Sequence, residues 1–280
     1  MIKMIVQKQT INNIYQDSFR KSLSIQLSLD GFSFCISNTE TKEIQHLTYY
    51  TFKSTVITPE ALLKEIEMLY QQNRKILEQK FEQVTVIHQN NLATLVPTAL
   101  FDENELNTYL AYSIKTLETD YIAFDALEQL DIQNVYIPYV NINNFFFQNF
   151  GTFEYKHHAT VLIDKLILHA KNNTALQYFV HVSANSFDIV VLKDSELLLY
   201  NTYSYTTKED FIYYILFTAE QLELNPETLH LTFLGAIEES SELYQITYQY
   251  IRNIDFIQID HSFFDLNEKV PNHSNYITTP

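Results

Sequence analysis

The pattern of apolar and polar positions predicts three strands and a helix early in the chain. Apolar side chains alternate with polar ones over residues 24–29, the period-two pattern of a strand with one buried face. Further strands are expected over 32–37 and 44–52. A helix should follow over 58–77, because Thr58 can cap its first turn and apolar residues then recur every three or four positions.

The same order recurs later in the chain. Strands are expected over 178–182, 187–192 and 197–203, and the next helix opens with the capping-box pattern Thr206-Thr-Lys-Glu209. A further strand, helix and strand are expected over 229–234, 240–251 and 254–259. The two series therefore share one plan.

The two series also align residue by residue. The segment 27–36 lies over 180–189 at an offset of 153 residues, the separation of Ser28 and His181, and Ser33 then falls on Ser186. A repeat of this length indicates a duplicated domain. Three meandering strands followed by helix, strand, helix and strand are the layout of a ribonuclease-H-like half, so we expect an α/β fold of two such halves, with mixed sheets flanked by helices.

The first series carries additional elements. Extra strands are expected over 84–88, 92–96, 121–124 and 134–137, with helices over 102–115 and 157–171, the latter bridging the halves. The expected organisation is an N-terminal arm, a first half, a second half and a loose tail, over residues 1–20, 21–153, 154–262 and 263–280.

Composition restricts the partners. The net charge of −16 disfavours nucleic acid and anionic lipid, since neither gains the counterion release that basic proteins exploit. The charge serves solubility or meets a basic protein surface. No apolar run is long enough to span a membrane, and no secretory signal is evident. The single Cys35 excludes an internal disulfide and is expected to be a structural thiol. We expect a cytoplasmic protein; its oligomeric state is left open.

Glycine content changes the picture more than charge does. The chain has three glycines, Gly31, Gly151 and Gly235. Loops that bind phosphate need glycine where backbone N–H groups approach the phosphate closely or where φ is positive. The sequence therefore has few positions suited to such a loop.

One segment nevertheless resembles a phosphate motif. Residues 181–192 are similar to the second phosphate motif of DnaK-type chaperones, Asp-Leu-Gly-Gly-Gly-Thr-Phe-Asp-Val-Ser-Ile-Leu. The frame is kept at Ser186, Phe187, Asp188 and Leu192. The three glycine positions fall on Ser183, Ala184 and Asn185. The leading Asp, which in that family organises the metal and its water, falls on His181, and on Ser28 in the first copy.

A second motif supports the same resemblance. Residues 231–236 look like the adenosine motif of that family, with Gly235 kept and Ala236 in place of the second glycine. Together these residues give a resemblance to the actin-like ATPase superfamily. Residues 84–112 resemble its pilus-assembly and division proteins, which are cytoplasmic scaffolds, and the chain is similar to an uncharacterised bacterial family with this fold.

The resemblance implies a degenerate site. Ser28 and His181 supply no carboxylate for Mg²⁺, and side chains at the former glycine positions would fill the space of the phosphates. We therefore expect no catalytic residue, no metal and no cofactor. Were ATP or ADP with Mg²⁺ retained, Ser33, Ser186, Asp188 and Gly235 would lie nearest to it.

Several side chains keep two interpretations. Asp30 is a turn former beside Gly31 or a substitute metal carboxylate, and Asp188 could serve the site or face solvent. His181 is a satisfied core residue or a metal ligand. The histidines of the bridging segment, His157, His158 and His169, suit a solvated helix. The aromatic run 145–147 with Phe150 could mark an exposed docking patch.

Three functions remain open. The favoured hypothesis is a non-catalytic binding or scaffolding pseudo-ATPase that holds a protein or peptide partner in the cleft between its halves or at a sheet edge. The second is a divergent ATP- or ADP-binding protein. The third is a small-molecule kinase or other enzyme that uses the cleft.

Overall fold

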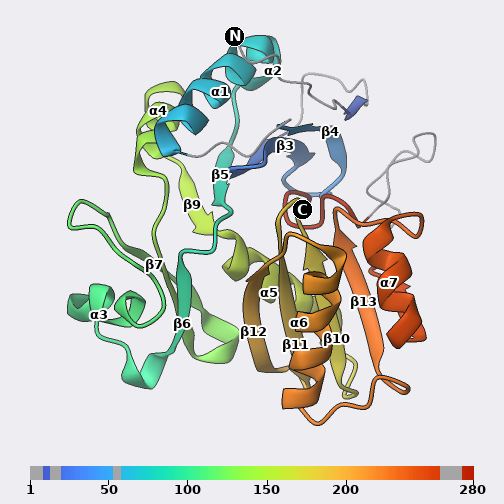
Figure 1. Ribbon diagram of the computed structural model, residues 1–280. Helices are drawn as coiled ribbons and strands as arrows, with labels where there is room; N and C mark the ends of the chain where they lie inside the picture. Colours follow the sequence, from blue (N-terminus) through green and yellow to red (C-terminus); the bar gives the residue numbers. More distant parts are fainter. Residues whose placement is uncertain (1–8, 13–19, 53–57, 259–272) are drawn as a thin grey trace. The chain divides into compact units, whose positions relative to one another are not determined.

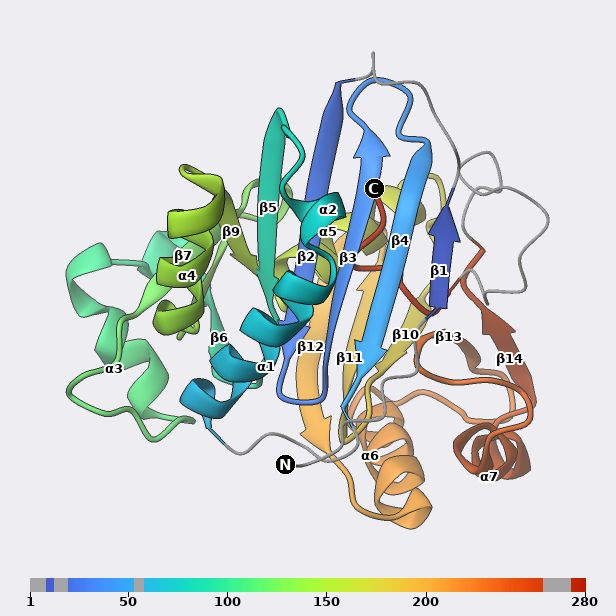
Figure 2. The ribbon, with the colours of Figure 1, turned by 90° about the horizontal axis from the view of Figure 1, so that it is seen from above.

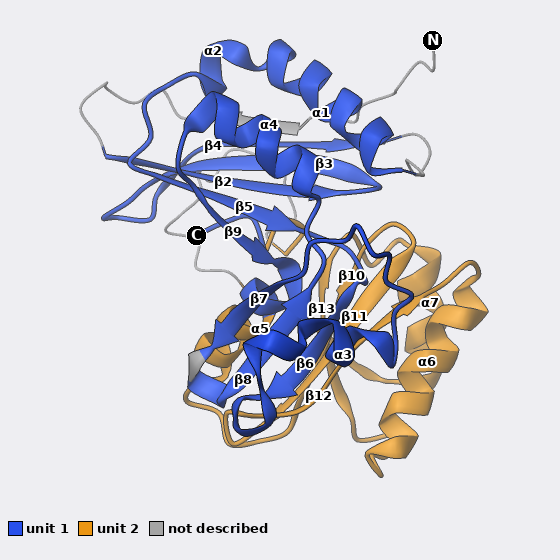
Figure 3. Cartoon of the chain, turned by 90° about the vertical axis from the view of Figure 1, so that its left-hand side faces the viewer, with its two compact units in different colours: residues 1–162, 261–266, 277–280 blue, residues 163–260, 267–276 orange. Residues whose placement is uncertain are grey.

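The computed structural model describes residues 9–12, 20–52, 58–258 and 273–280 (Figure 1). These residues form two compact units (Figure 3). Unit 1 holds the described residues up to 162 together with 277–280, and unit 2 holds 163–258 together with 273–276. Among the described residues, no helix combines the length and the apolar character that a membrane crossing requires.

The boundary between the units falls within helix α5 (His158–Ala170) and not at residue 153. The first turn of α5 is tied to unit 1, because the Thr160 hydroxyl donates to Asp125 Oδ2 at 2.8 Å. Its last turn belongs to unit 2, where the His169 ring packs edge-on against Phe179 with centroids 6.2 Å apart. A continuous helix thus contributes to both units.

The main sheet of unit 1 has six strands in the order β1-β4-β3-β2-β5-β9 (Figures 1 and 2). Strands β2, β3 and β4 form an antiparallel meander, while β5 and β9 add in parallel. The bounds are Gln9–Asn12, Lys21–Ser28, Gly31–Asn38, Ile44–Thr51, Gln83–His88 and Glu154–His157 for β1 to β5 and β9. The expected arm thus contains β1, which pairs with β4; residues 1–8 and 13–19 lie outside the described residues.

Helix α1 (Pro59–Gln72) covers one face of this sheet (Figure 2). It buries Leu62, Ile66 and Leu69 against the inward residues of β2, such as Ile25. The predicted continuous helix is interrupted at Asn73, and α2 (Arg74–Leu77) follows. The interruption has a polar cause, because the Asn73 side chain donates to the Leu69 carbonyl at 2.7 Å and bonds to the Tyr50 hydroxyl.

Helix α4 (Val140–Phe150) packs beside α1 and was not predicted. Three phenylalanines of the expected docking patch, Phe145, Phe146 and Phe150, pack in or against the core of unit 1. Only Phe147 is exposed. Helical spacing separates the members of the run, so they do not form one exposed surface.

Unit 1 also contains a three-stranded antiparallel sheet in the order β6-β8-β7. Its strands β6, β7 and β8 span Ala93–Pro97, Ala123–Leu127 and Ile132–Tyr136. One face packs on α3 (Leu106–Ala111) around Leu110 and Val135. Short 3₁₀ helices η1, η2 and η3 span Thr98–Leu100, Glu103–Glu105 and Glu128–Leu130. The predicted helix over 102–115 is therefore a 3₁₀ turn followed by six α-helical residues.

The other face of this small sheet carries a buried polar cluster. Asp125 accepts bonds from the Tyr136 hydroxyl at 3.0 Å, the His157 backbone N–H at 2.8 Å and the Thr160 hydroxyl. Burial raises the pKa of Asp125, and these three donors oppose the rise. His157 and His158 are buried here, which contradicts the solvated helix expected for them. His157 is the last residue of β9, and His158 is the first residue of α5, at its buried start.

Unit 2 is a five-stranded mixed sheet in the order β12-β11-β10-β13-β14. Strands β10 to β14 span Gln177–Val182, Ser186–Lys193, Glu196–Ser204, His230–Gly235 and Asn253–Phe256. Helices α6 (Lys208–Gln221) and α7 (Glu242–Tyr250) pack on one face (Figure 1). The capping box of α6 lies one residue later than predicted, with Thr207 as N-cap and Asp210 as its partner.

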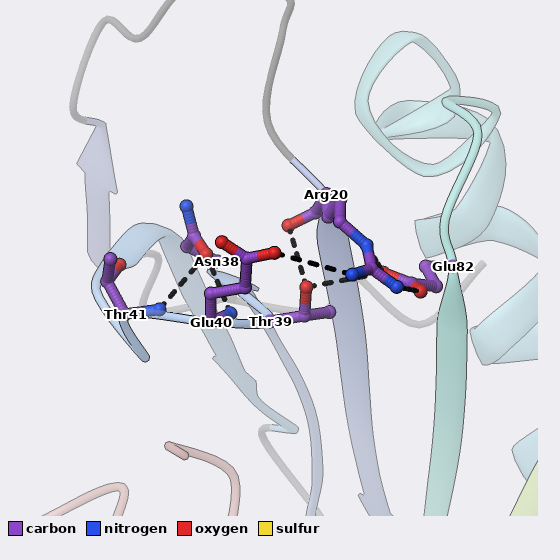
Figure 4. Close-up of polar contacts among 6 residues, drawn as sticks. All are labelled: Arg20, Asn38, Thr39, Glu40, Thr41 and Glu82. Carbon is purple, nitrogen blue, oxygen red and sulfur yellow. Dashed lines mark hydrogen bonds and ion pairs between the residues drawn. The ribbon is translucent and has the colours of Figure 1, made fainter.

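A cluster of exposed polar residues links the start of β2, the turn after β3 and the start of β5 in unit 1 (Figure 4). The Arg20 guanidinium pairs with Glu82, just before β5, and its Nη1 lies 3.3 Å from Glu40 Oε1 in the turn after β3. The Asn38 side chain accepts the backbone N–H groups of Glu40 and Thr41. These contacts fix the turn, while the exposed ion pairs add little stability.

His88, at the end of β5, gives unit 1 a pH dependence. Burial lowers its pKa to about 4, from an ordinary value of 6.5, despite the 2.8 Å contact from its Nε2 to Asn143 Oδ1. The unfolded chain therefore binds a proton at a pH where the folded chain does not, and acid favours unfolding. We expect the free energy of unfolding to fall by about 2 kcal/mol between pH 6.5 and pH 5 from this group. Urea denaturation of the wild type and of His88→Gln across that pH range measures this change. If the free energy of unfolding depended on pH equally in the two proteins, His88 would not be its source.

Candidate functional site

The hairpin of β10 and β11 holds the motif positions of unit 2. Its loop, Ser183–Asn185, takes the place of the expected glycines. The Ser183 N–H donates to the Ser186 carbonyl at 2.9 Å, within the hairpin. The Tyr205 hydroxyl lies 2.8 Å from the Ser183 carbonyl and 2.9 Å from that of Ala184. The loop is thus closed by a tyrosine that packs against the core of unit 2.

A buried polar cluster lies on the two strands of this hairpin. His181 and Asp188 are register partners, and His181 Nδ1 lies 2.9 Å from Asp188 Oδ2. Asp188 Oδ1 accepts bonds from the Thr202 hydroxyl at 2.6 Å and the Tyr200 hydroxyl at 3.0 Å. Asp188 is 2% exposed, so the alternative that it faces solvent is wrong. His181, at the position of the family's leading Asp, is bonded to this carboxyl group.

The electrostatics keep Tyr200 a hydrogen-bond donor. Burial, and then the charge of Asp188, raise the pKa of Tyr200 far above its ordinary value. The phenol therefore stays protonated and directs its O–H at the carboxyl group. The Asp188 carboxyl group thus forms hydrogen bonds with three side chains of its own unit, those of His181, Tyr200 and Thr202.

The end of β13 carries the adenosine-motif positions. Gly235 has φ +86°, and its backbone N–H donates to the His273 carbonyl at 2.9 Å. The Ala236 N–H donates to the Val182 carbonyl at 2.7 Å, which continues the pairing of β13 with β10. An added Cβ at Gly235 would lie 2.2 Å from the Val182 carbonyl oxygen. Chain packing alone therefore requires this glycine.

The first hairpin places Ser28, Asp30 and Ser33 in unit 1. The Ser28 hydroxyl accepts the Asp30 N–H at 3.1 Å across the turn between β2 and β3. Ser33 is buried in β3, and its hydroxyl lies 3.0 Å from the hydroxyl of Thr278. Thr278 also donates to Gln26 Oε1 at 2.5 Å. A residue from the predicted loose tail therefore packs on the first motif hairpin.

The described part of this tail, residues 273–280, is packed; residues 263–272 lie outside the described residues. In unit 2, His273 Nε2 donates to the Ile237 carbonyl at 2.7 Å and its ring stacks on Phe256. In unit 1, Ile277 and Thr278 are buried. Ser33 and Gly235, two of the four expected nucleotide positions, thus each contact the tail within their own unit.

The sequence signal for these contacts was weak. Tyr200 and Thr202 lie on the third strand of the meander, where period-two alternation was the only indication that they share a face. The tail gave no periodic signal. Among the residues that the structure describes, no group of three or more His, Cys, Asp or Glu side chains is placed to hold a metal ion.

Comparison with known proteins gives the family. A family model described as "Protein of unknown function (DUF3822)" matches residues 9–254, which is most of the chain. The chain belongs to this family. No curated protein matches it.

Solved structures show the fold. This chain is similar to a Bacteroides thetaiotaomicron protein described as having an actin-like ATPase fold and unknown function. The TM-score is 0.75 and the sequence identity 22%, and the match covers 86% of this chain and 91% of that one. The type IV pilus biogenesis complex PilM-PilN matches with TM-score 0.61 and 12% identity, over 92% of this chain and 96% of that one. The expected actin-like fold is confirmed.

Proposed function

We propose that this chain is a non-catalytic binding protein on an actin-like fold, a pseudo-ATPase that holds a protein or peptide partner. The observation that carries this proposal is the tail. Thr278 bonds to Ser33 and Gln26 on the first motif hairpin, and His273 bonds to Gly235 at the second. Polar groups that a nucleotide would need are already used by the chain itself.

The chemistry of the motif positions supports the same proposal. Phosphoryl transfer in this fold depends on backbone donors for phosphate and carboxylates for Mg²⁺. Ser28 bonds within its turn, and His181 bonds to Asp188, whose second oxygen holds two hydroxyl groups. Side chains at the former glycine positions add bulk where close backbone approach is needed.

A protein partner in the cytoplasm fits the remaining observations. The net charge of −16 opposes nucleic acid, and the buried Cys35 is suited to a reducing compartment. One matching structure is described as a PilM-PilN type IV pilus biogenesis complex, which is a precedent for partner binding on this fold. We extend that mode of action, though not that partner, to this chain.

Isothermal titration of the nucleotide-free protein with ATP and ADP, with and without Mg²⁺, tests the proposal. We expect no heat of binding at millimolar nucleotide and an unchanged melting temperature. A nucleotide that did bind would raise the melting temperature, since a ligand at 100 times its Kd stabilises the native protein by about 2.7 kcal/mol. Micromolar binding would overturn the proposal. A variant that lacks residues 277–280 shows whether the contact of Thr278 with Ser33 and Gln26 is what prevents nucleotide binding. If this variant also fails to bind nucleotide, the changes at the motif positions are sufficient to prevent binding.

The tail contact itself gives a stability prediction. Thr278→Val keeps the shape of the side chain but leaves Gln26 and Ser33 without their tail partner. We expect the free energy of unfolding to fall by about 1–2 kcal/mol. Ser33→Ala, which removes one hydrogen bond, should cost less. Urea denaturation measures both; no change for Thr278→Val would mean that this contact adds nothing to stability.

A further inference from the structure

The small sheet of unit 1 and its helix form a surface that the proposed function has not used. We call residues 92–137, with β6, β7, β8 and α3, the lobe (Figure 3). Its exposed large hydrophobic side chains are Leu100, Tyr112, Leu117, Tyr121 and Phe124. Tyr112 is 90% exposed and Leu100 72% exposed, so neither side chain is buried in the core of the lobe. These residues lie in η1, after α3 and in and before β7, all within the lobe, and exposed apolar residues close to one another mark interaction sites.

Aromatic contacts connect parts of this apolar surface. The Phe124 ring lies 4.9 Å from the ring of Phe101, which stacks on Tyr109 at 6.0 Å. The Tyr109 hydroxyl donates to the Leu100 carbonyl at 2.8 Å. Tyr112 follows Tyr109 by three residues, at the end of α3. The Phe124 ring and the backbone at Leu100 are therefore held on the lobe core, so this part of the surface is ordered before a partner binds.

The lobe is also strongly acidic. Residues 92–137 contain eight Asp or Glu and one basic residue, Lys115, which gives −7 of the net −16. Several of these carboxylates are exposed beside the apolar residues: Asp102, Glu103, Glu105 and Glu118. Such a surface repels phosphate groups and a second copy of itself, and attracts a cationic segment.

We propose that the lobe docks a basic peptide segment of a partner protein, with apolar side chains as anchors on Leu100, Tyr112 and Phe124 and cationic side chains on the surrounding carboxylates. This inference rests on the proposed binding function and names its surface and the chemistry of its partner. Anchors supply affinity, and charge supplies steering and selectivity.

Fluorescence anisotropy with designed probes tests the docking surface in the full chain. The probe is a short labelled peptide of alternating lysine and leucine. Two counterparts replace either leucine by serine or lysine by glutamate. The variant Leu100→Ser with Tyr112→Ser removes two exposed anchors. The matched control, Tyr213→Ser with Phe217→Ser, removes two exposed aromatic residues from α6 in unit 2.

We expect the lysine–leucine peptide to bind wild type and the control equally, and the lobe variant about tenfold more weakly. Glu103→Lys with Glu105→Lys should also weaken binding and reduce its dependence on salt. Both peptide counterparts should bind poorly. Equal losses in the lobe and control variants, tight binding of the glutamate peptide, or no binding of the lysine–leucine peptide would overturn the assignment.

The outcome separates this inference from the proposed function. If the lobe fails these tests and nucleotide also fails to bind, the non-catalytic function stands and its surface lies elsewhere. If ATP binds with micromolar affinity, the proposed function fails whatever the peptides do.

Discussion

Gly235→Ala is expected to lower the free energy of unfolding by about 4 kcal/mol, since backbone strain and a steric clash each cost about 1–3 kcal/mol. The residue has φ +86°, where an L side chain is strained. The new Cβ would also lie 2.2 Å from the carbonyl oxygen and 2.9 Å from the nitrogen of Val182, and these are backbone atoms that cannot rotate away. Urea denaturation followed by circular dichroism measures the change.

Gly151→Ala is the matched control. Gly151 also has positive φ, +74°, at the end of α4, but an added Cβ there meets nothing within 4 Å. Only the dihedral cost remains, about 1 kcal/mol. Similar losses for the two variants would show that contact with Val182 does not decide the requirement for glycine at position 235.

Asp188→Ala is expected to lower the free energy of unfolding by about 4 kcal/mol, because removal of one partner of a buried, hydrogen-bonded pair costs about 3–5 kcal/mol. The substitution leaves His181 Nδ1 and the hydroxyl groups of Tyr200 and Thr202 without their shared acceptor. It also leaves a small cavity where the buried carboxyl group was. Urea denaturation at neutral pH measures the loss.

Single-donor variants set the scale for this cluster. Tyr200→Phe and Thr202→Val each remove one bond to Asp188, and each should cost about 1 kcal/mol. A loss for Asp188→Ala no larger than these would mean that the three donors find other partners and that the cluster does not act as a unit.

The strands of both meanders could be predicted from the sequence. Strand β2 buries one face and its apolar residues alternate with polar ones, while the central strands β3 and β11, buried on both faces, are short apolar-rich runs bounded by turns. Helix α4 could not, because its asparagines and phenylalanines lack a clear stripe or cap. The break at Asn73 could not be predicted because the apolar spacing of the helix continues across it. The break depends on the bond between the Asn73 side chain and the Tyr50 hydroxyl on β4, which is distant in sequence.

The candidate site was predictable only in part. Once the hairpin is placed, antiparallel pairing puts His181 opposite Asp188. The contacts from β12 depend on register, and the pairing of β11 with β12 shifts at Val191 and Leu192. Thr278 lies 245 residues from Ser33 in sequence, and no local pattern reports such a contact.

That separation has a consequence for folding during synthesis. Gln26 and Ser33 lie on the second and third strands of unit 1, yet their partner Thr278 leaves the ribosome only after all of β10 to β14. Contacts of such sequence separation form late, since loop closure must come first. Until then the Ser33 hydroxyl and Gln26 Oε1 lack their tail partner, although Gln26 Nε2 can already bond to Gln89 within the first unit. The closing contact of the first motif hairpin is therefore made only when synthesis of the chain is nearly complete.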